Sequence, residues 1–309
     1  MPFDLLAQLW LHEPDQAMAV RGSSLFGLAP ADPGQLAVAY TDIFLLNVYP
    51  YGTIFTDPVG EMNGPAAQAM ARLYAQHGYQ PPELSAVGAP DHLGLGLGFL
   101  GHSTNRGLED AFAQACGELL AWALLACLAV EREPGAHAFY RGLAAFTADT
   151  LLLNAGRFTI DALDWQAQEL PGLALAMDQS AVDDDEVRLR DLVRFFLTPA
   201  RSGIFLSRGR LGGFARELGV ALPFGARYDV ATALFTAAGQ SERLDLLLNQ
   251  LAAEVQAWAA VYRQWATTYP AWAAVAEHWL NCTAGTLRLV SAMRDRASAE
   301  HQSVPAEPG

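Results

Sequence analysis

Lysine is missing from this sequence of 309 residues, and all 19 basic residues are arginine. The phosphate-binding loop GxxxxGK[ST] is therefore excluded in its usual form. The 33 acidic residues give a net charge of −14, and the arginines form no basic cluster. Because nucleic-acid binders normally carry a basic face, the composition argues against a nucleic-acid partner and favours cationic partners.

Cysteine is scarce as well, and Cys116, Cys127 and Cys282 have no CxxC spacing. This argues against a disulfide framework and against a zinc site, and we expect all three to be buried apolar side chains. The sequence contains no GxSxG, HExxH or ExxH motif, and His92 and His102 stand ten residues apart. It therefore predicts no catalytic residue, no metal site, no cofactor and no enzyme activity.

A secretory or membrane segment is not evident either. The first ten residues, MPFDLLAQLW, lack the basic start and cleavage site of a signal peptide. The apolar run from Leu119 to Val130 is shorter than the roughly 20 residues that cross a bilayer. We expect a cytoplasmic protein without stable membrane insertion.

Apolar residues, by contrast, are abundant: they make up 52% of the chain, against 17% charged residues. This balance is typical of a packed globular protein. Apolar positions recur at steps of three and four, and no alternating strand pattern of useful length occurs, so the predicted fold is all-α. The expected helices cover residues 2–13, 35–48, 65–77, 92 onward, 108–132, 139–153, 161–170 and 183–197.

The most regular pattern lies in the final third of the chain, where two runs on either side of Pro270 alternate steps of four and three residues. This is a heptad seam, and it predicts two long helices joined by a tight turn with their seams facing each other. An aromatic-lined ligand cleft between them is the alternative. The seam residues are Leu244, Leu248, Leu251, Val255, Trp258, Tyr262, Trp265, Tyr269, Trp272, Val275, Trp279, Cys282, Thr286, Leu289 and Met293.

A hinge is predicted at Glu133-Pro134-Gly135. It divides an N-terminal helical part, residues 1–132, from a helical continuation over 136–185. A C-terminal extension over 186–296 and a flexible tail over 297–309 follow. Because the break at the hinge is short, exchange of one part between two copies would give a homodimer.

The stretch APDHLGLGLGFLGHS, residues 89–103, places an acid, a histidine and four glycines in one apolar segment. Leu93, Leu97 and Leu100 predict a helix that starts at His92, with Asp91 capping its first turn. The glycines weaken this helix and are useful where another backbone has to come very close.

Two features of this stretch allow a chemical interpretation. The GxGxxG spelled by residues 96–101 lacks the preceding strand and the following acid-ended strand of a dinucleotide site. Asp91 and His92 are either an acid–base pair or a capping acid beside a partly buried histidine.

Several residues of the first half occur in a recognisable order. Tyr40 and Phe44-Leu45 precede Pro50-Tyr51; Tyr74, Gly78-Tyr79, Pro90-Asp91-His92-Leu93, Leu97 and Phe99 follow, ahead of the 133–135 hinge. In these residues, over roughly 35–155, the chain resembles the TorD/DmsD/NarJ family of cytoplasmic chaperones that mature molybdenum-containing oxidoreductases. It departs from the family at Tyr51-Gly52-Thr53, where Tyr-Glu-Ser is usual.

The resemblance implies a TorD-like helical bundle, here with an additional C-terminal helical hairpin. It also implies a chaperone that holds the apo catalytic subunit of a molybdenum- or tungsten-pterin oxidoreductase, or its N-terminal leader, until the cofactor is inserted. On this view the glycines admit the client backbone. The alternative is a helical scaffold or regulatory module whose C-terminal hairpin pairs with another chain. The residues expected to bind the client are Tyr49, Tyr51, Phe55, Pro90, Asp91, His92, Leu97 and Phe99.

Overall fold

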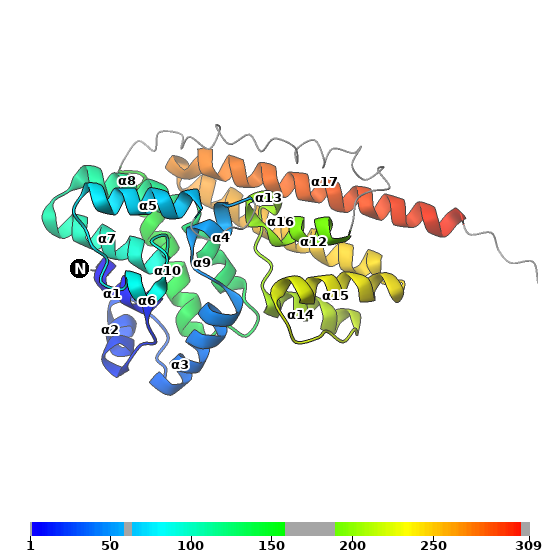
Figure 1. The fold of residues 1–309 in the computed structure, drawn as a ribbon, viewed down its shortest axis with the longest axis horizontal. Helices are drawn as coiled ribbons and strands as arrows, with labels where there is room; N and C mark the ends of the chain where they lie inside the picture. Colours follow the sequence, from blue (N-terminus) through cyan, green and yellow to red (C-terminus); the bar gives the residue numbers. More distant parts are fainter. Residues whose placement is uncertain (1, 59–63, 158–188, 304–309) are drawn as a thin grey trace, which may run out of the picture.

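The computed structural model describes residues 2–58, 64–157 and 189–303. Every regular element in these residues is a helix, and the extended pairing there is limited to a bridge between Tyr51 and His92. The all-α prediction is therefore confirmed (Figure 1). The helix expected over 161–170, and the start of the one expected over 183–197, lie outside the described residues.

The N-terminal part forms one side of the molecule (Figure 1). Its helices enclose a core that includes Trp10, Phe99, Leu124 and Tyr140. The elements are α1 (Pro2–Leu11), α2 (Gln16–Phe26), α3 (Pro33–Tyr40), the π-helix η1 (Thr41–Asn47), α4 (Gly52–Thr56), α5 (Pro65–Gln76), α6 (Leu84–Val87), α7 (Leu93–Arg106), α8 (Glu109–Leu120), α9 (Ala123–Arg132) and α10 (Ala138–Ala155).

The C-terminal part is built around a long hairpin, α16–α17, as its heptad seam predicts. Smaller helices pack beneath the hairpin, and the end of α17 projects beyond the rest of the molecule (Figure 1). The elements are α12 (Leu189–Leu197), α13 (Pro199–Ser202), α14 (Arg208–Leu218), α15 (Arg227–Gln240), α16 (Leu244–Thr268), the 3-10 turn η3 (Pro270–Trp272) and α17 (Ala273–Ser303).

Some expected elements differ from the observed ones. The single helix expected over 108–132 is two helices, bent by 47° at Ala121-Trp122, and α17 extends into the expected tail as far as Ser303. The sequence pattern missed α2, α14 and α15, and also the short helices α4, α6 and α13. Short runs rich in glycine and serine, such as α2, form helices here because tertiary packing overrides their weak local preference.

The glycines of α7 bring two helices together, as the sequence suggested, but the approaching backbone belongs to the same chain. A β-carbon on Gly94 would lie 2.5 Å from Leu11 Cγ and 3.0 Å from the Ala7 carbonyl oxygen, both on α1. Gly101 also faces α1, and Gly96 faces Leu119 of α8. The expectation that these glycines admit a client backbone is therefore wrong for this structure, because α1 and α8 fill the space.

The hairpin also closes the break between α8 and α9. The indole of Trp272 donates to the Leu120 carbonyl at 2.9 Å, and that of Trp279 donates to the Ala121 carbonyl at 3.1 Å. Carbonyls at a helix end have no partner within the helix, and leaving them buried and unpaired is unfavourable. The seam of the hairpin is therefore used within the chain, both between α16 and α17 and against the N-terminal part.

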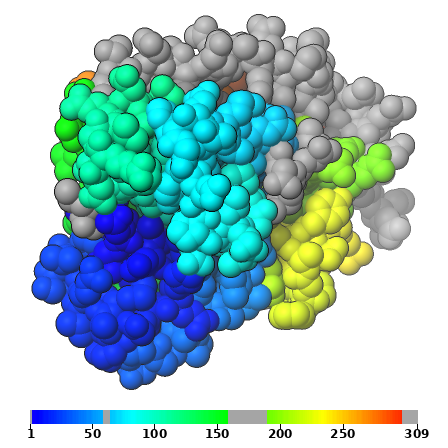
Figure 2. Space-filling view, turned by 60° about the vertical axis from the view of Figure 1, so that its left-hand side comes forward, coloured from blue at the N-terminus to red at the C-terminus, as the bar shows by residue number. Residues whose placement is uncertain are grey.

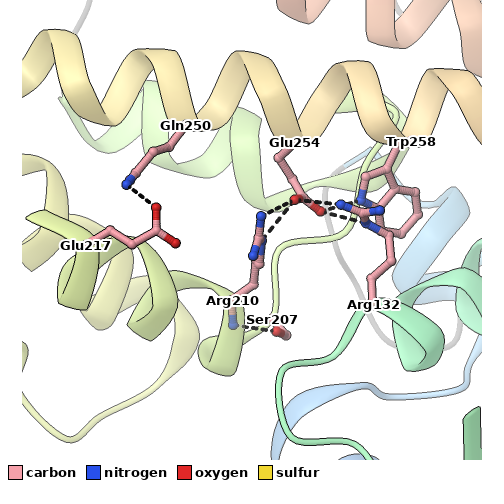
Figure 3. Close-up of polar contacts among 7 residues, drawn as sticks. All are labelled: Arg132, Ser207, Arg210, Glu217, Gln250, Glu254 and Trp258. Atoms are coloured by element: carbon pink, nitrogen blue, oxygen red, sulfur yellow. Dashed lines mark hydrogen bonds and ion pairs between the residues drawn. The ribbon is translucent and has the colours of Figure 1, made fainter.

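A buried ion cluster joins the two parts (Figure 3). Glu254 of α16, with 1% of its side chain exposed, accepts two hydrogen bonds from Arg132 of α9, at 2.8 and 2.9 Å. Arg210 of α14 and the Trp258 indole also donate to it. Burial alone would raise the pKa of Glu254, but the hydrogen bonds and charges of the two arginines outweigh it, and the pKa lies below its usual value. The carboxylate is thus ionised and neutralised by both parts.

The predicted hinge lies beside this cluster. Gly135 has a φ of 82°, which only glycine adopts readily, and it turns the chain so that α10 packs back against α9. Glu133 is buried next to Ser207 and Gly209 at the start of α14, and burial raises its pKa to about 7. The hinge residues are therefore packed against the C-terminal part.

The glycine contact can be tested with two alanine substitutions. Gly94→Ala is expected to lower the free energy of unfolding by about 1–3 kcal/mol, because the new methyl group overlaps Leu11 and the Ala7 carbonyl. Gly117→Ala is the control: apart from the backbone of its own helix, α8, no atom lies within 4 Å of its β-carbon position, so a gain of up to about 1 kcal/mol is expected. Urea unfolding measures both; equal effects would contradict the close packing of α1.

The ion cluster can be tested with Glu254→Gln. We expect a loss of about 3–5 kcal/mol in the free energy of unfolding, because two half-buried guanidinium groups lose their counter-charge. Glu217→Gln is the control, since Glu217 is exposed and bonds to Gln250 of the same α16 (Figure 3). It should change stability by less than about 1 kcal/mol. Similar losses in both variants would show that the cluster does not hold the parts together.

Candidate functional site

Two loop segments that are distant in the sequence meet at the Pro-Asp-His turn. Tyr51 and His92 pair as an isolated antiparallel bridge, and the Gly52 amide donates to the Asp91 carbonyl at 3.0 Å. The Tyr51 hydroxyl donates to the Val87 carbonyl at 2.9 Å. The structure thus brings Tyr51, Asp91 and His92 together, as expected.

The Asp91 carboxylate caps a different helix from the one predicted. Its Oδ2 accepts from the Thr53 backbone amide at 2.7 Å and from the Thr53 hydroxyl at 2.5 Å. Both donors lie in the first turn of α4, whose amides have no partner within the helix. Asp91 is thus a helix cap, but it caps α4 and not the helix that follows it, so the predicted target is wrong.

His92 supplies the cap of α7. Its Nδ1 accepts from the Gly94 amide at 3.1 Å, and its ring meets Tyr51 edge-on with centroids 4.9 Å apart. Burial lowers the pKa of His92 to about 3, and His12 acts in the same direction. The imidazole is therefore neutral at physiological pH. Asp91 and His92 are therefore buried capping residues, and the geometry does not fit an acid–base pair.

The remaining predicted residues divide by burial. Phe55 is buried against Trp122 and Phe205, and Phe99 is buried among Tyr74 and Tyr79. Together with Leu97, Asp91 and His92, they are closed off from solvent, whereas Tyr49, Tyr51 and Pro90 are half-buried. The five buried side chains support the site from beneath. That a client contacts any of the eight predicted residues stays a prediction.

Exposed apolar side chains lie immediately before this turn. Leu45 is 56% exposed and Leu46 is 41% exposed, and both belong to η1. Leu36, Tyr40 and Phe44 point into the core, so the two leucines that follow fall on the outer face. We call Leu45, Leu46 and the neighbouring Tyr49 the η1 patch. The sequence pattern predicts Leu45 within the helix but does not by itself mark it as exposed. The spacing of four residues between Leu36, Tyr40 and Phe44 could have indicated this exposure.

The π-helical geometry shapes this segment. Val48 donates its amide to the carbonyl of Ile43, five residues back, and the Asn47 side chain donates to the Asp42 carbonyl at 2.9 Å. Single π turns are rare and are frequent at functional sites. The widened turn leads directly into the loop at Pro50.

The described residues give little sign of a metal site, a reactive thiol or a membrane span. It contains no group of three or more His, Cys, Asp or Glu side chains that could hold a metal ion. Cys116 and Cys127 are buried, and burial raises the pKa of Cys116 to about 12, so its thiol stays protonated. Cys282 is half-buried. Within the same residues no one helix has the length and apolar content to span a membrane, and the bent pair α8–α9 meets these criteria only jointly.

The segment that carries these features resembles a known protein family. Residues 14–129 match the family model described as nitrate reductase delta subunit. The match runs from before α2 into α9 and includes the η1 patch and the Pro-Asp-His turn. The comparisons with curated proteins and with solved structures gave no match.

The matched family consists of NarJ/TorD-type assembly chaperones of molybdoenzymes, which are not catalysts and which bind the catalytic subunit of nitrate reductase. Over the matched residues this supports a general chaperone role and a molybdoenzyme as the kind of partner. The broader part of the resemblance found in the sequence is thus supported.

Because His92 is buried, the free energy of unfolding should depend on pH through this side chain. The unfolded chain binds a proton near pH 6.5, but the folded protein does so only near pH 3. Stability is therefore lost as the pH falls from 6.5 toward 3, by up to about 1.4 kcal/mol per unit. His92→Asn keeps a good capping residue and should flatten this loss, as measured by urea unfolding at about pH 7 and about pH 5.

A comparison of two variants separates the contribution of His92 to the pH dependence from those of other titrating side chains. Burial raises the pKa of Glu131 and Glu133 to about 7, and their contributions change with the opposite sign, being lost as the pH rises from 4.5 to 7. His137→Asn is the matched control, since His137 is half-buried and caps α10 in the same way. An unchanged pH slope in His92→Asn would contradict the assignment of a neutral buried imidazole.

Proposed function

We propose that the protein is a cytoplasmic chaperone that binds the apo catalytic subunit of a molybdenum- or tungsten-pterin oxidoreductase, or its N-terminal leader. It assists cofactor insertion and assembly and then releases the client for use or export. The observation that carries the proposal is the exposed η1 patch, which lies within the family-matched segment and beside the turn that carries the resemblance. Exposed apolar side chains gathered in this way are typical of protein-binding surfaces.

The client contacts the outer layer of the site. Tyr49, Tyr51 and Pro90 are reachable from solvent, and Leu45 and Leu46 extend the surface that they form. Asp91 and His92 act beneath them: their caps fix the start of α4 and α7, and hence the position of Tyr51. This arrangement supports a rigid platform that is complete before the client arrives, which lowers the entropy lost on binding.

The expected affinity suits a temporary complex. Burial of four apolar client side chains contributes about 6–12 kcal/mol in total, at roughly 1.5–3 kcal/mol each. Association opposes this with at least about 4 kcal/mol of lost freedom. The remainder corresponds to weak or micromolar binding, so the client can leave once its cofactor is in place.

The scaffold alternative finds less support. It needs the hairpin seam to be free for another chain, yet Trp272 and Trp279 are buried and bonded to the α8–α9 break. A homodimer formed by exchange at residues 133–135 stays a prediction, and Glu133 would have to leave its buried place beside Ser207 and Gly209.

A double charge substitution tests the proposal. Leu45→Glu with Leu46→Glu should reduce recovery of a co-expressed apo molybdoenzyme subunit by at least about tenfold, because the apolar contact is lost. Binding is measured by affinity purification from cells that cannot make the pterin cofactor. Far-UV circular dichroism should be unchanged, since both leucines are exposed.

Leu153→Glu serves as the matched control, because Leu153 is exposed to a similar degree but lies on α10. It should leave recovery of the client unchanged. Full recovery with the double variant, or failure of the wild-type protein to bind any apo molybdoenzyme subunit, would refute the proposal.

A further inference from the structure

The π-helical segment beside the Pro-Asp-His turn is held from the C-terminal part of the chain. Asn47, which is 8% exposed, accepts a hydrogen bond through its Oδ1 from the Gly209 amide of α14 at 3.0 Å. Its Nδ2 donates to the Asp42 carbonyl at 2.9 Å, five residues back in η1. One side-chain amide therefore joins η1, which carries Leu45 and Leu46, to a helix 162 residues further along the chain.

This bond also completes the start of α14. Gly209 lies in the first turn of α14, where the amides have no partner within the helix. Ser207 caps the Arg210 amide, and Asn47 serves the Gly209 amide. An amide left without a partner at a packed junction is unfavourable. Asn47 is therefore a cap that the N-terminal part supplies to the C-terminal part.

The hinge closes the same junction from another side. A β-carbon on Gly209 would overlap the Glu133 carboxyl group. The Glu133 side chain is also hydrogen-bonded to Ser207, the N-cap of α14. The start of α14 thus contacts η1 and the hinge together, and only glycine fits at position 209. On the face shown in Figure 2, the blue and cyan surface of the N-terminal part meets the yellow surface of the C-terminal part.

η1 is the element that this junction can influence. It continues α3 without a break but in the wider π register, in which the Val48 amide bonds to the Ile43 carbonyl, five residues back. π-helices are rare, so contacts outside the helix have to favour this register over the α register. Here such contacts come through Asn47, bonded to Asp42 on one side and to Gly209 on the other. A change to the α register would move every later residue around the helix axis, and with it the η1 patch.

We infer that docking of the C-terminal part regulates the client site through Asn47, which holds η1 in the π register that presents the η1 patch. This rests on the proposed function and adds a regulation to it. The docked arrangement binds the client, and the undocked arrangement binds it weakly. By linkage, a client bound to the η1 patch strengthens docking by the same factor. Asn47 and Gly209 are positioning residues, which act on the client only through η1.

Gly209→Ala tests the inference in the free, full-length protein. The new methyl group overlaps Glu133, so α14 should withdraw and the amide of residue 209 should leave Asn47. Amide hydrogen exchange over residues 43–48 should then be at least about tenfold faster, because η1 opens more often. Gly212→Ala in the same helix is the matched control, since apart from the backbone of α14 no atom lies nearer than 3.8 Å to its β-carbon position. It should exchange like the wild-type protein.

Asn47→Ala removes the same bond from the other side. It should speed exchange of the same amides, and it should add little to Gly209→Ala, because both substitutions remove one contact. Recovery of the co-expressed apo molybdoenzyme subunit should fall by about tenfold in each single variant, although Leu45 and Leu46 are unchanged. Gly212→Ala should recover the subunit as fully as the wild-type protein does.

A reciprocal measurement separates regulation from a general loss of stability. In the complex of the wild-type protein with the apo subunit, the amides of α14 should exchange more slowly than in the free protein, although the η1 patch contains no residue of α14. Asn47→Ala, studied at a subunit concentration that saturates it, should lose this protection of α14 while the subunit stays bound. A merely structural role of Asn47 would leave the protection in place.

Three results would overturn the inference: unchanged exchange over residues 43–48 in Gly209→Ala and Asn47→Ala, full recovery of the apo subunit by both variants, or unchanged exchange of α14 when the subunit binds. If Leu45→Glu with Leu46→Glu still loses the subunit in those cases, the proposed function stands and only its regulation by docking is refuted. If the wild-type protein binds no apo subunit, the proposed function fails, and the inference fails with it.

Discussion

The buried carboxylate of Glu254 is the interaction on which the arrangement of the two parts depends. An ionised carboxylate out of contact with water is tolerated only when charges and donors surround it. Here Arg132 comes from the end of α9 and Arg210 from α14, so the carboxylate is satisfied only when the N-terminal and C-terminal parts are docked. The indoles of Trp272 and Trp279 add a second requirement, since they satisfy carbonyls that the α8–α9 break would leave unpaired. The C-terminal part therefore belongs to the folded body of the protein.

The residues that carry the family resemblance serve mainly to build the site. Asp91 and His92 are buried caps that fix two helix starts, and the Tyr51–His92 bridge fastens one loop to the other. Asp91 and His92 therefore serve the turn itself, whichever partner the chain binds. In the function proposed above, choice of partner falls to the exposed residues around the turn, in particular Leu45 and Leu46. This separation explains how a recognisable motif can coexist with the departure at Gly52, where a side chain would meet the Trp122 ring at 2.9 Å.

The fold was predictable from the sequence where one pattern dominates and unpredictable where tertiary contacts decide. The hairpin seam and the helix beginning after His92 follow from spacing alone. The break at Ala121-Trp122 does not, because the run around it is apolar on all sides and only the docked tryptophans stabilise the free carbonyls. In the site, the sequence identified the turn but could not separate its buried residues from its exposed ones. The glycines of α7 are the clearest case: their pattern indicates a close backbone and does not reveal that the backbone is α1.

The docking of the two parts has a consequence for the proposed client surface. Because Gly209 of α14 is bonded to Asn47 of η1, the position of η1 relative to α14 is set by the same docking that satisfies Glu254. The two contacts come from adjacent residues of α14, since Arg210, which follows Gly209, donates to Glu254. A surface assembled in this way is rigid only while the parts stay together, so loss of the ion cluster weakens the client site without touching any residue in it. The acidic charge elsewhere on the chain then has a separate effect: it keeps a protein with exposed leucine and phenylalanine side chains soluble, because like charges oppose self-association through those side chains.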